Sequence, residues 1–543
     1  MRPPPQLRKA ASTVTKFVGR PRCLPHRKRQ LCSQTPPANR SFSSTPSVLN
    51  NVLDSSFLSH GTEPTDDARC DRGISMASSA AAPPPLKQLL LFFLLLLSFV
   101  ARIPVSSPAA AAAAAEPVLP EESLPARSGY LPVSPTSGSA IFYAFYEAQR
   151  PTTPPSQTPL LIWLQGGPGC SSMTGNFYEL GPWRVSSVAH NAERLVVEPN
   201  PGAWNRLFGL LFLDNPIGVG FSVAASPEEI PRDQFTVAKH LFAAITAFVE
   251  LDGAFKSRPI YVTGESYAGK YVPAIGYYTL KWNAELPPSQ RLNLAGVAIG
   301  NGLTDPVTQV ATHAVNAYFS GLINERQKSE LEKAQGEAVK LTEMGNWSQA
   351  TAARTGVLRL LQNMTGLATL YDFTRKVPYN TQWVTRLLQQ PEVKRALKAN
   401  ESIVFDECSA AVGAVLHDDV MKSVKYMVEH LVENSRVLLY QGHSDLRDGV
   451  VSVEAWVKTM RWGGIDEFLS AERKVWRVNG ALAGYVQRSG SLSQAVVLGA
   501  GHLVPTDQPL SAQVMIEDWV LEKGLFADSK EDERPARRHR LAI

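Results

Sequence analysis

Short apolar runs alternate with longer amphipathic segments through the central part of the chain. The runs predicted to be sheet strands are 140–146, 159–164, 207–214, 260–263, 294–301, 436–440 and 494–498. Residues 233–251 have helical periodicity, and a helix-compatible segment follows 264–269. Continuous apolar runs suit strands buried on both faces, and strands that alternate with helices indicate a parallel sheet. The hydrophobic pattern therefore predicts an α/β fold, with residues 128–146 as an opening hairpin.

This alternation stops after Thr304. Residues 305–400 are polar and mainly helical in pattern, and they hold three Asn-x-Ser/Thr sequons, at Asn346, Asn363 and Asn400. Three sequons in one polar segment of a secreted chain suggest an exposed, glycosylated insertion. We interpret the segment as a helical cap over the carboxyl edge of the sheet. The alternative is an ordinary surface subdomain with no role in a site.

Both ends of the chain differ in composition from its centre. Residues 1–75 form a basic leader whose composition resembles that of a transit peptide. A second leader starts at Met76, with an apolar stretch at 89–100 and a small-residue tract at 109–115. The apolar stretch has the length of a signal-peptide core rather than of a membrane span. We therefore interpret 76–115 as a signal peptide with a linker, and 1–75 as an upstream extension; an uncleaved signal anchor is the alternative.

The remaining chain divides into a folded part, 116–528, and a charged tail, 529–543, that is predicted to be disordered. The net charge of +5 comes from the leaders, because residues 117–543 sum to −3. The sequence has no basic patch of the kind that would indicate a nucleic-acid partner. The folded part contains two cysteines, Cys170 and Cys408, which are too few and too far apart for a zinc site of the usual spacing. They are two buried thiols or one long-range disulfide, and no metal or organic cofactor is implied.

Three polar residues that follow predicted strands form a candidate nucleophilic site. Ser266 lies in Gly264-Glu-Ser-Tyr-Ala-Gly269, where small residues let the backbone reverse between a strand and a helix. Asp445 and His502 follow the strands at 436–440 and 494–498. A serine becomes nucleophilic when a neutral imidazole accepts its proton, and a carboxylate orients that imidazole. Each residue alone has an ordinary structural interpretation, but the order Ser, Asp, His is that of α/β-hydrolases.

Five motifs extend this pattern along the chain. They are Trp163-Leu-Gln-Gly-Gly-Pro-Gly-Cys-Ser-Ser172, Tyr178-Glu-Leu-Gly-Pro182, Asp214-Asn-Pro-Ile-Gly-Val-Gly-Phe-Ser222, Gly264-Glu-Ser-Tyr-Ala-Gly269 and Gly501-His-Leu-Val-Pro505. Together they resemble the serine carboxypeptidases, especially the plant serine carboxypeptidase-like group. The resemblance covers roughly residues 125–527. It implies an α/β-hydrolase fold with a central, mainly parallel sheet, flanking helices and a cap insertion.

The resemblance also implies a role for individual residues. It assigns Ser266, Asp445 and His502 to a catalytic triad, and the N–H groups of Gly167 and Tyr267 to an oxyanion hole. Four further residues are implied to bind the terminal carboxylate of the substrate: Gln165, Gly166, Glu179 and Glu265. It pairs Cys170 with Cys408 in a disulfide. Two acids and a substrate carboxylate cannot all be ionised together, so we expect raised pKa values and hydrolysis that favours acidic pH.

Two departures from the family pattern bear on specificity more than on fold. Gln165 stands where these peptidases usually carry Asn, and Leu-Arg-Asp-Gly-Val at 446–450 replaces a more apolar run. The leading hypothesis is a secreted or vacuolar serine carboxypeptidase that acts on peptide or protein C-termini, without stable membrane association once the signal is removed. The alternatives are an acyltransferase that uses an activated ester donor, and a catalytically silent binding protein.

Overall fold

The computed structural model describes residues 119–188 and 191–527. The leader, signal peptide and tail expected at 1–75, 76–115 and 529–543 lie outside these described residues. Within the described ranges, no helix is both long enough and apolar enough to cross a membrane.

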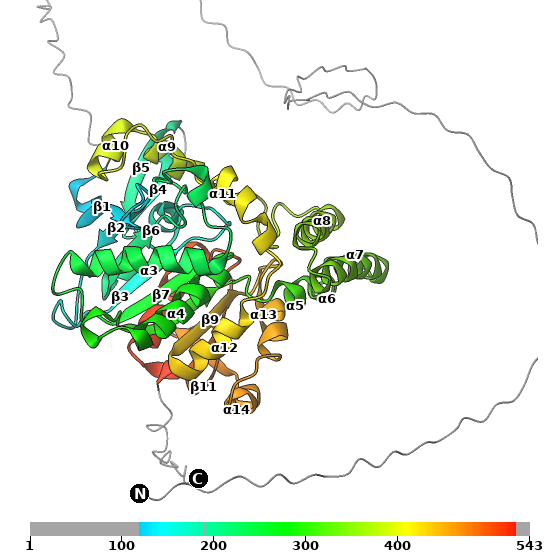
Figure 1. Ribbon diagram of the computed structural model, residues 1–543. Helices are drawn as coiled ribbons and strands as arrows, with labels where there is room; N and C mark the ends of the chain where they lie inside the picture. The colour runs from blue at the N-terminus through cyan, green and yellow to red at the C-terminus, as the bar shows by residue number, and fades with distance from the viewer. Residues whose placement is uncertain (1–118, 189–190, 528–543) are drawn as a thin grey trace, which may run out of the picture. The chain divides into compact units, whose positions relative to one another are not determined.

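A ten-stranded sheet forms the centre of the fold (Figure 1). In spatial order its strands are β1 (Arg127–Pro132), β2 (Ala140–Tyr146), β6 (Gly209–Leu213), β3 (Leu160–Leu164), β7 (Ile260–Glu265), β8 (Leu294–Gly300), β9 (Arg436–Gly442), β12 (Leu492–Val497), β11 (Ala481–Ser489) and β10 (Lys474–Val478). The strands from β6 to β12 in this order run parallel, and the strands at both edges are antiparallel. The predicted α/β fold with a mainly parallel sheet is therefore confirmed.

Alternate residues of the central strands fill two hydrophobic cores, one on each face of the sheet. Along β3, Ile162 and Leu164 belong to the first core, whereas Leu161 and Trp163 belong to the second. Every residue of β3, β6, β7 and β12 is buried, as expected for strands covered on both faces. Helices that contribute residues to the first core include α3 (Gln234–Glu250), α4 (Ala268–Glu285), α12 (Lys425–Asn434), α13 (Val450–Val457) and α14 (Ile465–Ser470), and α16 (Pro509–Val520) is among those that contribute to the second.

Two β segments were not predicted from the sequence. One is the antiparallel edge formed by β11 and β10, and the other is the separate hairpin of β4 (Trp183–Val188) and β5 (Asn191–Pro199). In β10 the buried residue is Trp476, and its neighbours are exposed or half-buried. An exposed edge strand needs no apolar run, so the hydrophobic pattern gives no signal for it.

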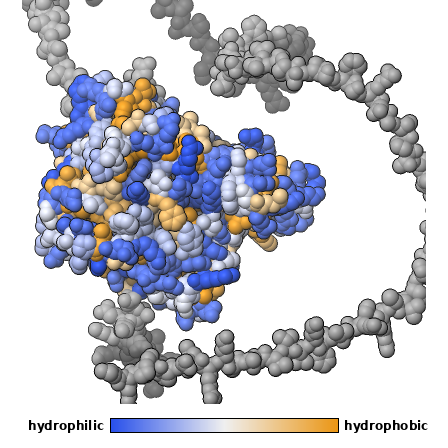
Figure 2. Space-filling model, viewed as in Figure 1, coloured by the Kyte–Doolittle hydropathy of each residue, from blue (hydrophilic) through white to orange (hydrophobic). Residues whose placement is uncertain are grey.

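Helices predominate between residues 305 and 400. They are α5 (Pro306–Val310), α6 (His313–Phe319), α7 (Glu325–Glu343), α8 (Trp347–Thr365), α9 (Gln382–Leu388) and α10 (Pro391–Ala396). Helices α7 and α8 pack on each other around a third core and project from one side of the sheet (Figure 1). This lobe is mostly hydrophilic on the face seen in Figure 2. The side chains of Asn346, Asn363 and Asn400 are all exposed.

Candidate active site

Ser266 occupies a strained turn at the carboxyl end of β7. Its φ angle is 62°, in the left-handed region that residues with a Cβ rarely adopt. The Ser266 N–H donates to the Gly300 carbonyl (3.0 Å), and the Ser266 carbonyl accepts from the Leu303 N–H (2.9 Å). A Cβ at Gly264 would lie 2.4 Å from the Leu164 carbonyl oxygen, so the turn requires glycine there. The predicted strand, turn and helix are therefore present, with α4 beginning two residues after Ser266.

His502 and Asp445 form a hydrogen-bonded pair at the carboxyl ends of β12 and β9. His502 Nδ1 lies 2.7 Å from Asp445 Oδ2, and because an ionised carboxylate only accepts, Nδ1 carries the proton. The other ring nitrogen, Nε2, is buried without a hydrogen-bond partner in the described part of the chain, and in this tautomer it is a proton acceptor. Ser266 and His502 line the same cavity. His443 precedes Asp445 along the chain. Its side chain is exposed, and it is not among the described residues that line the cavity.

Three residues that sequence reasoning missed hold the acid and the imidazole in place. Asn301 Nδ2 donates to Asp445 Oδ2 (2.7 Å), and the Arg447 N–H donates to Asp445 Oδ1 (2.7 Å). The ring centroid of Tyr371 lies 4.6 Å from that of His502, and its carbonyl accepts from the His502 N–H (2.7 Å). Arg447 in turn donates to the Tyr371 hydroxyl (2.8 Å). The one sequence signal for these contacts was the position of Asn301 at the carboxyl end of a predicted strand.

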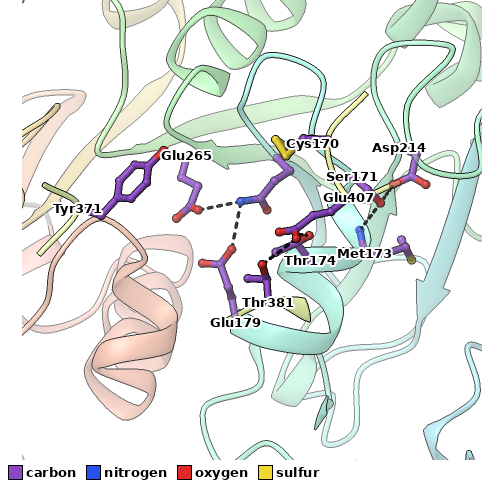
Figure 3. The surroundings of a disulfide bond; sticks show 12 residues. Cys170, Ser171, Met173, Thr174, Glu179, Asp214, Glu265, Tyr371, Thr381 and Glu407 are labelled. Atoms are coloured by element: carbon purple, nitrogen blue, oxygen red, sulfur yellow. Dashed lines mark hydrogen bonds between the residues drawn. A yellow bond between two sulfur atoms is a disulfide. The ribbon is translucent and has the colours of Figure 1, made fainter. Parts of the chain in front are cut away.

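Two buried glutamates share one amide group close to Ser266. Gln165 Nε2 donates to Glu265 Oε1 (2.8 Å) and to Glu179 Oε1 (3.1 Å), as the dashed lines in Figure 3 show. Gln165 Oε1 accepts from the Trp163 indole (2.8 Å), which fixes the orientation of the amide. The Oε2 atom of each glutamate is buried and has no hydrogen-bond partner among the residues described. Gln165 is one methylene longer than the Asn that serine carboxypeptidases usually carry at this position, and its amide contacts both Glu179 and Glu265.

The electrostatics of this pair follow from burial. Burial raises the pKa of the Glu179 carboxyl to about 7. The pKa of Glu265 is also raised well above its ordinary value, first by burial and then by the neighbouring Glu179 charge. The pair therefore retains protons at mildly acidic pH, and a protonated carboxyl donates a hydrogen bond to an anion.

The Gly166–Gly167 turn lies against the first turn of α4. A Cβ on Gly166 would come within 2.6 Å of the Tyr267 nitrogen, so this approach of two backbones requires glycine. Gly167, with a φ angle of 112°, lines the cavity together with Ser266. The Tyr267 hydroxyl donates to Asp419 Oδ2 (2.6 Å), which anchors the N-cap residue of α4. The segments that carry Gly167 and Tyr267 thus meet beside Ser266.

A cavity of about 270 Å³ is lined by several of these groups, whereas Glu179, Asp445 and Tyr267 are not among its described lining residues. Its lining includes Gln165, Gly166, Gly167, Glu265, Ser266 and His502, all singled out from the sequence, and also Thr174, Thr369, Tyr371, Tyr379, Thr381 and Glu407, which were not. A disulfide joins Cys170 to Cys408 in the cavity wall, as the resemblance implied. In the part of the chain that the structure describes, no cluster of His, Cys, Asp and Glu has the arrangement of a metal site.

Comparisons with known proteins show the family of the chain. The sequence pattern of the serine carboxypeptidase family matches residues 117–522. Serine carboxypeptidase-like 50 of Arabidopsis thaliana is 61% identical over 411 residues, which cover 76% of this chain and 90% of that protein. Probable serine carboxypeptidase CPVL of Homo sapiens is 33% identical over 418 residues, covering 75% of this chain and 85% of that protein.

A solved structure supports the same assignment. Kex1(delta)p, a prohormone-processing carboxypeptidase from Saccharomyces cerevisiae, aligns with a TM-score of 0.66 and 25% sequence identity. The alignment covers 75% of this chain and 95% of that one. The family match includes Ser266, Asp445 and His502 together with the residues of the cavity. The chain therefore belongs to the serine carboxypeptidase family.

Proposed function

We propose that this protein hydrolyses the last peptide bond of a substrate through an acyl-enzyme on Ser266. The observation that carries the proposal is that Ser266, His502 and Glu265 share one cavity. Ser266 and His502 are the nucleophile and base that acyl transfer requires, and Asp445 orients the base. A protonated carboxyl beside them selects substrates that end in a free carboxylate.

In the acylation step, His502 Nε2 accepts the Ser266 hydroxyl proton while Oγ bonds to the carbonyl carbon of the last peptide bond. The N–H groups of Gly167 and Tyr267 stabilise the oxygen that becomes negative. The C–N bond then breaks, and His502 gives its proton to the leaving amine. In deacylation, a water molecule takes the place of the amine, and its oxygen bonds to the acyl carbon while His502 accepts a proton from the water. The ester C–O bond then breaks, and His502 returns the proton to Ser266 Oγ.

We assign the binding of the substrate's terminal carboxylate to Gln165, Gly166, Glu179 and Glu265. At acidic pH the glutamate pair holds protons and donates to the carboxylate. As the pH rises through about 7, Glu179 ionises, and the pair then repels the substrate. We therefore expect kcat/KM for peptide hydrolysis to be higher at acidic pH than above pH 7.

Blocked dipeptides test this function directly. The full chain is expressed in a host with an oxidising secretory pathway and incubated with N-acyl-Phe-Leu at about pH 5, where the glutamate pair is protonated. The C-terminal amide of the same peptide and the Ser266→Ala variant are the controls. Release of leucine from the acid form, loss of release in the variant and much weaker release from the amide are the expected results.

Two other outcomes separate the alternatives. If no peptide is cleaved but a fluorophosphonate probe labels Ser266, an acyltransferase that uses an activated ester donor replaces the peptidase. If folded protein is neither labelled nor active, a catalytically silent binding protein replaces both.

We further assign the protein to the secretory pathway, as a secreted or vacuolar glycoprotein. The Cys170–Cys408 disulfide suits an oxidising compartment, and the exposed side chains of Asn346, Asn363 and Asn400 are accessible to glycosylation. Endoglycosidase treatment of the protein from its native tissue should lower its apparent mass. An unchanged mass would contradict glycosylation at these sequons.

A further inference from the structure

Glu407 is an acidic side chain in the cavity that the catalytic scheme leaves without a role. It precedes Cys408 of the disulfide, and its Oε2 atom accepts from the Thr381 hydroxyl (2.7 Å). Among the residues that the structure describes, the hydrogen bond to its Oε1 atom is a long one, from the Thr174 hydroxyl (3.4 Å). Neutral hydroxyls thus orient the carboxylate without neutralising it.

The charge of this carboxylate is not balanced by a cation among the described residues. Among the residues that the structure describes, none forms an ion pair with Glu407, and the charged neighbour that acts on it is another acid, Asp406. The described residues that line the cavity include no lysine or arginine, and the other acid among them is Glu265. A partly buried carboxylate without a cation is destabilised unless it binds a proton or a ligand supplies the positive charge.

The position of Glu407 relates it to one part of the substrate. Thr174 directly precedes η2 (Gly175–Glu179), the π-helical turn that carries Glu179, so Glu407 contacts the segment that holds one member of the carboxylate-binding pair. The Glu407 carbonyl also accepts from the Ser171 N–H (2.8 Å), next to Cys170. Figure 3 shows Glu407, Thr174 and Thr381 together on one side of the glutamate pair. The residue whose terminal carboxylate is bound by that pair is the leaving residue. Because Ser266, Glu265 and Glu407 line one cavity, the side chain of that residue would occupy space that Glu407 borders.

We propose that Glu407 makes this part of the cavity a site for a cationic leaving residue, so that peptides ending in lysine or arginine are preferred over neutral analogues. This inference rests on the proposed carboxypeptidase function and specifies its substrate class. A charge-assisted hydrogen bond between the Glu407 carboxylate and a lysine ammonium or arginine guanidinium is the interaction that gives the preference.

A matched pair of substrates isolates this interaction. N-acyl-Phe-Lys and N-acyl-Phe-norleucine differ in the terminal ammonium group and share the same four-carbon stem. Their kcat/KM values are compared at about pH 6.5, because burial raises the pKa of the Glu407 carboxyl and the preference needs its ionised form. The wild-type enzyme should favour the lysine peptide by about tenfold, the effect of one charge-assisted hydrogen bond. A wild-type preference for norleucine overturns the inference without any variant.

Two variants locate the effect. Glu407→Gln should abolish the lysine preference while leaving hydrolysis of the norleucine peptide within about threefold, because the amide keeps the shape of the side chain and can still bond to both threonines. Asp406→Asn, the matched control, removes an equal charge from the exposed neighbouring residue and should keep the wild-type preference. An unchanged preference in Glu407→Gln, or an equal loss in Asp406→Asn, contradicts the assignment to Glu407.

A binding measurement separates this inference from the proposed function. The Ser266→Ala variant is titrated by calorimetry with both peptides, with and without Glu407→Gln. Hydrolysis of the norleucine peptide without a lysine preference refutes the cationic site and leaves the carboxypeptidase function intact. Absence of hydrolysis together with tighter lysine-peptide binding that is lost in the double variant refutes the function and supports the site. Absence of both hydrolysis and binding refutes both.

Discussion

Replacing Glu179 with glutamine removes a proton-binding group from the buried pair and keeps its shape. In the wild type, burial raises the pKa of this carboxyl from 4.5 to about 7. A raised pKa in the folded state stabilises the protein fully below the unfolded pKa, and this stability is lost as the pH rises through the folded pKa. The whole pKa difference is equivalent to roughly 3 kcal/mol. The wild type therefore loses about this much stability between pH 4.5 and 7, whereas glutamine cannot ionise.

The assay is denaturant unfolding of the wild type and Glu179→Gln at pH 5, 6, 7 and 8. We expect the free energy of unfolding of the variant, relative to the wild type, to increase with pH by about 3 kcal/mol across this range. In parallel, kcat/KM for N-acyl-Phe-Leu should fall above pH 7 in the wild type, and the fall should be weaker in the variant. Glu198→Gln, an exposed position on β5, is the matched control.

Two results would refute this reasoning. A stability difference that is constant from pH 5 to pH 8 means that Glu179 does not hold a proton in the folded protein. An equal pH-dependent difference in Glu198→Gln means that the effect comes from overall charge rather than from the buried pair.

Three further predictions concern other parts of the site. Asp445→Asn should lower kcat by about 10⁴ with little change in KM, because the amide favours the wrong imidazole tautomer; steady-state kinetics showing less than about a tenfold loss would contradict the role of Asp445. Replacing Cys170 and Cys408 with serine should lower the free energy of unfolding by about 2–5 kcal/mol in denaturant titrations, since the bond joins residues 238 apart. Arg354→Ala should cost about 3–5 kcal/mol, because Arg354 of α8 lies 3.6 Å from the buried carboxylate of Asp448. Adding Asp448→Asn to Arg354→Ala should recover part of that loss, as measured by thermal unfolding. An equal loss in the single and the double variant would contradict the ion-pair explanation.

Much of the fold could be predicted from the sequence because burial leaves a local signature. Strands covered on both faces, such as β3 and β7, appear as continuous apolar runs. The edge strands β10 and β11 have mixed polarity, so they were missed. Their conformation depends on pairing with a neighbour, which the local pattern does not record.

The candidate site was predictable to the extent that its residues stand at recognisable places along the chain. Ser266, Asp445 and His502 each follow a strand, and carboxyl ends of parallel strands meet at one edge of a sheet. Asn301 and Tyr371 carry no motif that identifies them as partners of the acid and the imidazole. Their contacts with Asp445 and His502 exist because segments far apart in sequence meet at that edge.

The sequence by itself determined the alternation of strands and helices, the order of the three candidate catalytic residues and the family resemblance. The tertiary structure decided which side chains share an environment. Gln165 bonds to Glu265, 100 residues away, and Glu407 reaches the same cavity from beyond the helical insertion. Burial among these segments raises the pKa of Glu179, and it also raises the pKa of Glu407. Periodicity along the chain records whether a residue is buried, but the electrostatic environment of a carboxyl depends on distances in three dimensions.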